Sequence, residues 1–138
     1  MIVIDASVWV SLLIPQDVHH AATSQWFQDV VRHGVKIFEP VILAVEVASA
    51  VARRTGDSAA ARLTSEQLFE ISAIEWLSLD RQLAEASVEI ASELKLRGAD
   101  AVYVAVARSR NLPLVTWDVE QLQRAASVIT VQTPTSEA

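Results

Sequence analysis

The sequence predicts an α/β protein, a three-layer α/β/α sandwich built around a central parallel sheet. Short β-branched or apolar runs of strand length alternate with longer segments of helical pattern. This alternation requires crossover connections, which place helices on both faces of a parallel sheet. The runs are apolar on both sides, as is typical of strands covered on both faces. Because the chain has 138 residues, 51% of them hydrophobic and 20% charged, we expect one compact domain.

The expected strands cover five runs, residues 2–4, 35–38, 74–79, 114–116 and 128–131. All three glycines lie where a helix is expected to end: Gly34 after QWFQDVVRH, Gly56 after VASAVARRT and Gly98 after ASELKLR. Another helix is expected to begin after Gly98. Residues 133–138 are predicted to form a flexible C-terminal tail, so the predicted domain covers residues 1–132.

The charge and cysteine content exclude several classes of function. Eleven Lys and Arg against 17 Asp and Glu give a net charge of −6, far from the basic surface of a passive phosphate binder. No cysteine occurs, which excludes disulfides, thiolate metal sites and cysteine nucleophiles. The apolar N-terminal segment lacks a basic region, contains Asp5 and stops at Pro15, too short for a membrane span. We expect a soluble, cytoplasmic protein that does not contact membranes.

Two aspartates follow expected strands. Asp5 closes the first strand, and Asp118 follows the run 114–116 with one residue between. Ligands of open parallel sheets collect beyond the carboxyl ends of the strands, so both side chains are predicted to reach one edge of the sheet. Asp118 also has the sequence of a helix N-cap, with Gln121 as the reciprocal partner of a capping box, and alone it does not distinguish a cap from a site.

Two further acids stand in apolar sequence. Glu46 is the only charged residue between positions 41 and 52, and its helical neighbours three and four residues away are not cationic. A buried carboxylate needs a partner, which must come from elsewhere in the fold; the alternative is a side chain that reaches solvent or a distant Arg. Asp100 opens a helix, where the helix dipole alone stabilises a carboxylate by about 0.3–1 kcal/mol.

Carboxylates that converge repel each other unless a cation joins them. Oxygen ligands in a chain without cysteine favour a hard ion, Mg²⁺ or Mn²⁺. Zinc is not indicated, because the adjacent His19 and His20 point to different helix faces and no HExxH spacing occurs. We expect the three histidines on the surface, namely His19, His20 and His33.

Four short motifs occur in a fixed order along the chain: Ile-Val-Ile-Asp5-Ala-Ser7, a lone Glu46 in a helix after the second strand, Arg97-Gly98-Ala99-Asp100-Ala101 at the start of a late helix, and Thr116-Trp117-Asp118 after a strand. In these motifs the chain resembles the PIN-domain nucleases from Met1 to about Val131. In size and layout it is most similar to the VapC-like toxins of toxin–antitoxin pairs. The resemblance implies a Mg²⁺- or Mn²⁺-dependent endoribonuclease with a catalytic, metal-binding acidic quartet of Asp5, Glu46, Asp100 and Asp118.

The chemistry of these residues agrees with the resemblance. Metal ions held by carboxylates activate a water for in-line attack at phosphorus. We expect Asp5, Asp100 and Asp118 to hold the metal, directly or through water. Glu46 either serves as a further ligand or orients the attacking water. Ser7 and Thr116 fall on the family's hydroxyl positions, where they are expected either to support a carboxylate or water or to make local hydrogen bonds at a strand end.

A cation must still guide the RNA backbone. Arg53 is the expected one, because it lies on the helical stripe of Glu46 and Ser49. Other basic residues also stand near helix ends, where they favour the helix dipole: Arg54, Lys95, Arg97, Arg108 and Arg110. The four tryptophans are expected in the core or an interface rather than in base stacking: Trp9, Trp26, Trp76 and Trp117.

The resemblance also implies partners, a two-fold homodimer and an antitoxin. Such an antitoxin lays an amphipathic segment in an apolar groove and offers a basic side chain to the acidic pocket. The 51% hydrophobic content agrees with apolar surface that another chain covers.

Two other functions remain open at this point. One is a phosphoryl-transfer domain with Asp5 as nucleophile. However, haloacid-dehalogenase-like phosphatases have a second Asp where this chain has Ser7. Response-regulator receivers need a lysine after a late strand, whereas the only lysines here are Lys36 and Lys95. The other is a non-catalytic α/β binding module, in which the carboxylates are caps and solvated charges.

Overall fold

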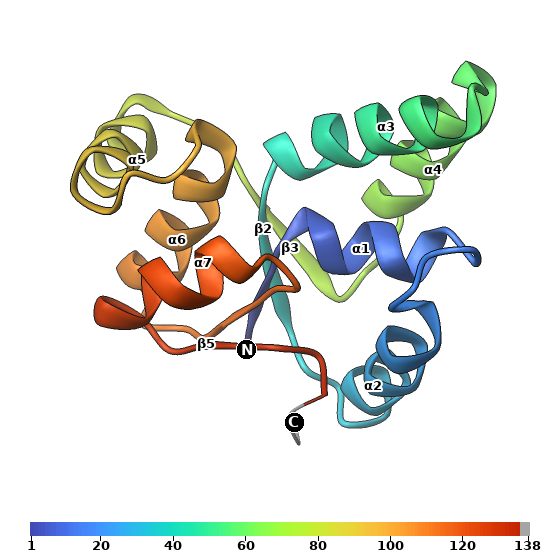
Figure 1. The fold of residues 1–138 in the computed structure, drawn as a ribbon, viewed down its shortest axis with the longest axis horizontal. Coiled ribbons are helices and arrows are strands. Elements are labelled where there is room, and N and C mark those ends of the chain that lie inside the picture. Colours follow the sequence, from blue (N-terminus) through green and yellow to red (C-terminus); the bar gives the residue numbers. More distant parts are fainter. Residues whose placement is uncertain (136–138) are drawn as a thin grey trace.

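Helices and short strands alternate along residues 1–135, which are the residues that the computed structural model describes (Figure 1). The elements in chain order are β1 (Val3–Ile4), α1 (Ala6–Leu13), α2 (His20–Arg32), β2 (Ile37–Pro40), α3 (Ile42–Thr55), α4 (Ser58–Phe69), β3 (Ile74–Leu77), α5 (Arg81–Leu94), α6 (Gly98–Arg110), β4 (Leu114–Val115), α7 (Val119–Arg124), a 3-10 turn η1 (Ala125–Ser127) and β5 (Val131–Gln132).

The strands are parallel throughout. β4 lies between β1 and β5, and β2 pairs with β3. A bridge between Ile2 and Ile37 joins the two groups, with the Ile2 amide donating to the Lys36 carbonyl at 3.0 Å and the Phe38 amide donating to the Ile2 carbonyl at 2.9 Å. The strands therefore follow the order β3-β2-β1-β4-β5. They form one central parallel sheet, as the sequence predicts.

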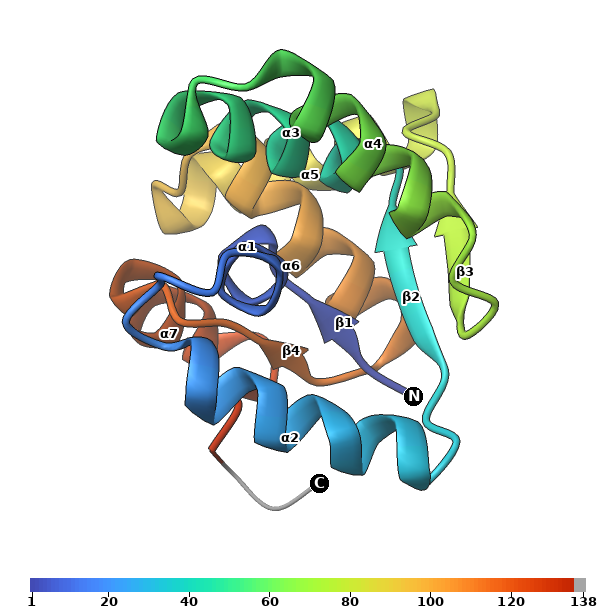
Figure 2. The ribbon, with the colours of Figure 1, turned by 90° about the vertical axis from the view of Figure 1, so that its right-hand side faces the viewer.

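Helices cover both faces of this sheet. In Figure 1, α5, α6 and α7 lie to the left of the strands and α1 to α4 to the right; in Figure 2, α1 and α2 lie in front of β1 and β4 while α5 and α6 lie behind. Helix α6 packs between α5 and the strands, and every residue from Ala101 to Ala107 is buried. The three-layer α/β/α fold is thus confirmed, and its most buried helix carries Asp100 in its first turn.

One of the three predicted helix ends is wrong. Gly34 and Gly56 have the left-handed backbone conformation, with φ of 62° and 70°, as expected of glycines that end helices. Helix α5, which was expected to end at Gly98, instead ends at Lys95, and Lys95 itself takes the left-handed conformation with φ of 56°. The Arg124 guanidinium donates to the Lys95 carbonyl and holds this turn. Gly98 therefore does not end a helix but begins α6.

The last strand lies later in the chain than the apolar run 128–131 predicts. The amides of Val128 and Ile129 both donate to the Ala125 carbonyl at 3.0 Å, because η1 continues α7 by one tight turn. Strand β5 begins only at Val131. In the predicted tail, Pro134 is buried, whereas residues 136–138 lie outside the described residues; the domain boundary after residue 132 stays a prediction.

No helix within residues 1–135 has both the length and the hydropathy needed to cross a membrane.

Candidate active site

Two acids lie side by side at the carboxyl ends of neighbouring strands. Strand β1 pairs with β4, and the Asp5 amide continues this pairing by donating to the Val115 carbonyl at 2.9 Å. Asp5 caps α1 and Asp118 caps α7. The side chain of Asp5 is buried, 3% exposed. The predicted convergence of these two residues at one edge of the sheet is therefore observed.

The Thr116 hydroxyl connects the two aspartates. It donates to Asp5 Oδ2 at 3.0 Å and accepts the Asp118 amide at 2.9 Å. The Ser7 hydroxyl lies 3.3 Å from it and accepts the Trp117 amide at 3.1 Å. The two hydroxyls expected near the acids are thus part of one network that orients them.

Glu46 reaches the same place from α3. Its Oε1 accepts the hydroxyl of Tyr103 on α6 at 2.7 Å. Burial and then the charge of Asp5 raise the pKa of Glu46, although the Tyr103 hydrogen bond opposes them. The partner of this carboxylate does come from elsewhere in the fold, as predicted, but it is a neutral phenol rather than a cation. Tyr103 itself was not singled out in the sequence, since its helical neighbours make it resemble an ordinary core residue.

Asp100, in the first turn of α6, is close enough to the other three acids for their charges to affect its pKa. Burial raises its pKa to about 7, and the charges of the other three acids, Asp5, Asp118 and Glu46, contribute to the increase. The opposing cation is Arg97, whose Nε lies 3.9 Å from Asp100 Oδ2 on a side chain that is 79% exposed. The pKa of Asp5 is raised as well, by burial and by Asp118, against the hydrogen bonds from Ser7 and Thr116.

Gln121 is a site residue that the sequence assigned to a different task. Asp118 accepts the Gln121 amide at 3.1 Å, so the predicted N-cap is present. The reciprocal bond of a capping box is absent among the described residues, because the Thr116 hydroxyl already accepts the Asp118 amide. The buried Gln121 side chain instead donates to Asp5 Oδ1 and to the Asp100 carbonyl, both at 3.4 Å.

Glu39 is a further buried acid that sequence analysis missed. Its Oε1 accepts the Ile4 amide at 2.7 Å, in the position where a neighbouring strand would normally supply a carbonyl. Burial raises its pKa well above the ordinary value, and Asp5 adds to the effect. A lone acid beside the apolar run 35–38 was the signal that could have identified it. Glu39 fixes the end of β1 directly before Asp5.

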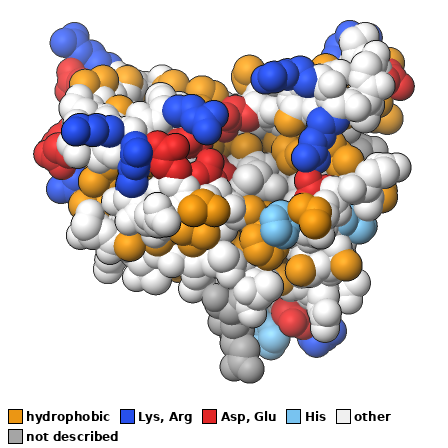
Figure 3. Space-filling model, viewed as in Figure 1, with side chains coloured by type: hydrophobic (Ala, Val, Ile, Leu, Met, Phe, Trp, Pro, Cys, Tyr) orange, Lys and Arg blue, Asp and Glu red, His pale blue; other side chains and the backbone are white. Residues whose placement is uncertain are grey.

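A cleft of about 600 Å³ between α1 and α3 reaches Glu46. Arg53, Ser49 and Glu46 all line this cleft, so the helical stripe that their spacing predicts faces one open space. Figure 3 shows acidic side chains gathered at the left of the central hollow, with basic side chains near its rims. Of the four acids, Glu46 belongs to the cleft lining, together with Ser7.

The expectation that all three histidines lie on the surface is only partly correct. His33 is exposed, but His19 and His20 are half-buried. His19 stacks on Trp117, and His20 Nδ1 bonds to the Ser11 carbonyl at 2.9 Å. These contacts fix the orientation of both rings. Trp9 and Trp26 are buried, at 1% and 5% exposure, in agreement with their expected place in the core.

The donor set suits a hard divalent cation rather than zinc. Its ligating atoms are carboxylate oxygens, and their mutual repulsion favours a cation. Within the described part of the chain, no group of three or more His, Cys, Asp or Glu side chains is arranged so that it could hold a metal ion. An open arrangement is compatible with Mg²⁺ or Mn²⁺, which keep several waters and take few protein ligands.

Comparison with solved structures gives the same fold over nearly the whole chain. The VapC20 toxin of Mycobacterium tuberculosis, described as cleaving the sarcin-ricin loop, is 16% identical with a TM-score of 0.79, and all of both chains is covered. FitAcB from Neisseria gonorrhoeae is 21% identical with a TM-score of 0.73, covering 97% of this chain and 98% of that one. VapBC2 from Rickettsia felis, bound to a promoter DNA fragment, is 14% identical with a TM-score of 0.71, covering 96% and 98%.

A search of curated proteins found no match. The family model described as PIN domain matches residues 2–127, a segment that contains the four acids, both hydroxyls, Tyr103 and Gln121. With this match and the observed fold, the chain belongs to the PIN domain family.

Proposed function

We propose that this protein is a divalent-metal-dependent endoribonuclease, the toxin of a toxin–antitoxin pair. The observation that carries the proposal is the hydrogen-bond network in which Thr116 joins Asp5 to the Asp118 backbone and Gln121 joins Asp5 to the Asp100 carbonyl. Burial, and then repulsion from the charges of the other three acids, raise the pKa of Asp100 to about 7. Such repulsion destabilises the protein without a cation, so the cluster is best understood as a binding site. The similar structures described as a sarcin-ricin-loop-cleaving toxin and as a toxin–antitoxin complex from Klebsiella pneumoniae support the biological role.

Asp5, Asp100 and Asp118 are proposed to hold Mg²⁺ or Mn²⁺, directly or through water. A bound ion of this kind supplies Lewis-acid chemistry, activating a water and neutralising the charge that develops on the phosphate. Glu46 either adds a ligand or orients the attacking water.

The surrounding side chains keep the acids in position for this task. Gln121 and Thr116 donate to opposite oxygens of Asp5, which fixes the plane of the carboxylate. Tyr103 fixes Glu46 from a fully buried position. Thr116 also holds the Asp118 backbone. These hydrogen bonds keep the acids near one another without the cation.

Arg53 is proposed to contact the RNA backbone, since it is exposed and lines the cleft with Glu46. An antitoxin is proposed to compete for this region, because a cluster of carboxylates attracts a basic side chain as it attracts a metal. Val41 and Val45 are exposed beside it, Val45 to 67%, and supply apolar contact area for such a segment. A homodimer is proposed as the form in solution.

The test is cleavage of RNA by purified protein with Mn²⁺ and with EDTA. We expect products with 5′-phosphate and 3′-hydroxyl ends, because an activated water rather than the 2′-hydroxyl attacks. Asp100→Asn should abolish cleavage, whereas Asp29→Asn, the same change at an exposed acid on α2, should not. A 2′,3′-cyclic phosphate product, or full activity in EDTA, would contradict the proposal.

Calorimetric titration with Mn²⁺ separates this proposal from a non-catalytic module, which has no reason to bind the ion at the acids. A phosphoryl-transfer enzyme that uses Asp5 as nucleophile would form a phosphorylated protein. The burial of Asp5 and the hydrogen bonds to both of its oxygens disfavour that role.

A further inference from the structure

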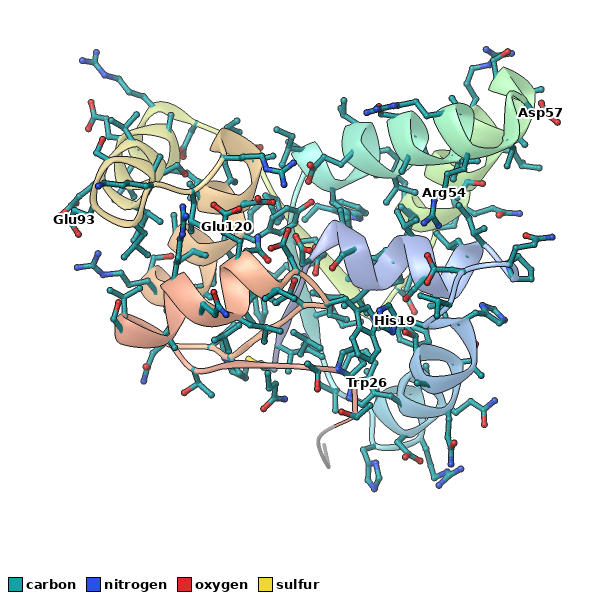
Figure 4. The ribbon with its side chains drawn as sticks, viewed as in Figure 1. His19, Trp26, Arg54, Asp57, Glu93 and Glu120 are labelled. Atoms are coloured by element: carbon teal, nitrogen blue, oxygen red, sulfur yellow. The ribbon has the colours of Figure 1, made fainter. Side chains whose placement is uncertain are left out.

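The cleft between α1 and α3 contains a stacked aromatic pair close to the acids. The rings of His19 and Trp117 are parallel within 8°, with centroids 3.9 Å apart. Both side chains line the cleft that reaches Ser7 and Glu46. Figure 4 shows His19 between α1 and α2, with Arg54 on the other side of α1. A flat aromatic surface thus lies in the same open space as the catalytic region.

Trp117 is a fixed support for the His19 ring. Its indole Nε1 donates to Thr23 Oγ1 at 2.9 Å, and its amide donates to Ser7 Oγ at 3.1 Å. It also directly precedes Asp118. The position of the ring pair is therefore tied to the acids by covalent and hydrogen bonds, so that a group stacked on it would be held at a constant place relative to the reaction centre.

Asp17 fixes the other side of the pair and links it to a cation. Its Oδ1 accepts the His19 amide at 2.8 Å, and its Oδ2 accepts Arg54 Nη1 at 2.7 Å. Arg53 and Arg54 are both exposed and both line the cleft. An aromatic ring with cations beside it is the combination that binds single-stranded nucleic acid, through base stacking and phosphate contacts.

We propose that His19, supported by Trp117, is a stacking surface for one unpaired base of the RNA substrate, and that Arg53 and Arg54 contact phosphates of the same strand. The proposal rests on the proposed RNA cleavage. A base is favoured over a peptide, because the ring pair is flat and the neighbouring arginines complement the phosphates on either side of a base. Trp117 then does not contact the base itself; it stacks on the His19 ring and holds that ring in position.

The test measures binding to a labelled octamer of adenosine, rA8, and to an abasic ribose-phosphate octamer. Fluorescence anisotropy is used in EDTA with Asp100→Asn protein, so that neither RNA is cleaved. We expect His19→Ala to weaken rA8 binding by about 5-fold or more and to leave the abasic octamer unaffected. His19→Phe should restore rA8 binding, because it keeps a ring. His33→Ala, at an exposed histidine, is the matched control and should change neither affinity.

Three results would overturn the subsite: equal weakening for both octamers, no effect of His19→Ala on rA8, or no rA8 binding up to millimolar RNA. If His19→Ala weakens only the binding of an antitoxin, the surface is a protein site and the proposal is wrong. Thermal melting of His19→Ala checks that the variant folds. Cleavage by the wild-type protein with Mn²⁺ is assayed in parallel. If the wild-type protein cleaves RNA but His19→Ala does not weaken rA8 binding, only the subsite is contradicted. If His19→Ala weakens rA8 binding but the wild-type protein does not cleave RNA, only the proposed function is contradicted.

Discussion

The environment of each acid depends on which neighbours donate hydrogen bonds to it. Asp5 accepts from the Ser7 amide, Thr116 and Gln121, so its charge is partly compensated despite burial. Asp100 faces Arg97 across 3.9 Å, and that cation is largely in water, where its effect is screened. The uncompensated repulsion therefore concentrates on Asp100, and its protonation should be visible in the stability of the protein.

We predict that the metal-free protein loses stability as the pH rises from 5 to 8. The pKa of Asp100 is about 7 in the folded chain against an ordinary 3.8, so the folded state binds more protons between these values. Its contribution is complete below pH 4 and disappears as the pH passes 7. Urea unfolding in EDTA should show a decrease on the order of 1–3 kcal/mol. Asp100→Asn should reduce this dependence, to which the raised pKa values of Asp5, Glu39 and Glu46 also contribute, and Asp29→Asn should keep it. An unchanged slope in Asp100→Asn would show that the other groups alone cause it.

Tyr103→Phe removes only the hydroxyl that positions Glu46. Because a hydrogen bond of this kind contributes about 0.5–1.5 kcal/mol, we expect kcat for RNA cleavage to fall about 3- to 10-fold, with KM nearly unchanged. Ser109→Ala is the matched control, since it removes a hydroxyl from the exposed end of the same helix. A proportional change in KM with constant kcat would assign Tyr103 to substrate binding instead.

At the scale of secondary-structure elements, three of the four acids lie at the N-termini of helices, and two of these follow short strands. Asp5 and Asp118 occupy the N-caps of α1 and α7, while Asp100 lies in the first turn of α6. Helix N-termini stabilise negative charge, which lowers the cost of bringing carboxylates together. Glu46 is the exception, because it lies within α3 and relies on Tyr103 from another helix.

Two glycine substitutions should have opposite effects. Gly56 ends α3 with φ of 70°, a conformation that costs an L residue about 1–2 kcal/mol, so Gly56→Ala should destabilise the protein by about 1 kcal/mol. Gly98 begins α6 without a positive φ, and an added Cβ there would meet nothing within 4 Å. Gly98→Ala should be neutral or stabilise by up to about 1 kcal/mol. Urea midpoints measure both; marked destabilisation by Gly98→Ala would contradict the ordinary backbone conformation and open space at Gly98.

At the scale of the whole molecule, the sheet edge combines an acidic pocket with a cleft that carries both aromatic and basic groups. The protein has a net charge of −6, so its overall field repels RNA; under the proposed function, local cations and a bound metal would overcome that field. If the acids bind a metal as proposed, its binding is measurable as a change in global unfolding.

Mn²⁺ should raise the melting temperature of the wild-type protein by mass action. The gain is about 2.7 kcal/mol in the free energy of unfolding at an ion concentration 100 times its Kd. Asp100→Asn should start equal or higher in EDTA, because repulsion is removed, and gain less from Mn²⁺. Asp5→Asn should be less stable than Asp100→Asn in EDTA, since an amide nitrogen would replace an oxygen that accepts a hydrogen bond. Equal Mn²⁺ gains in all three proteins would place the ion elsewhere.

The sequence by itself determined the three-layer fold, because the spacing of hydrophobic residues and the alternation of strand-length runs with helical segments are local patterns, and a parallel sheet with crossover helices requires both. It also indicated Asp5 and Asp118, since strand ends in such a sheet converge. Only the tertiary structure decided the roles of Tyr103, Gln121 and Glu39. Each is placed by packing between elements distant in sequence. The Gln121 side chain is free to reach Asp5 because the Asp118 amide, its expected partner in a capping box, already donates to Thr116. At the helix end, the Lys95 carbonyl accepts a hydrogen bond from Arg124, a contact across 29 residues that no local pattern contains.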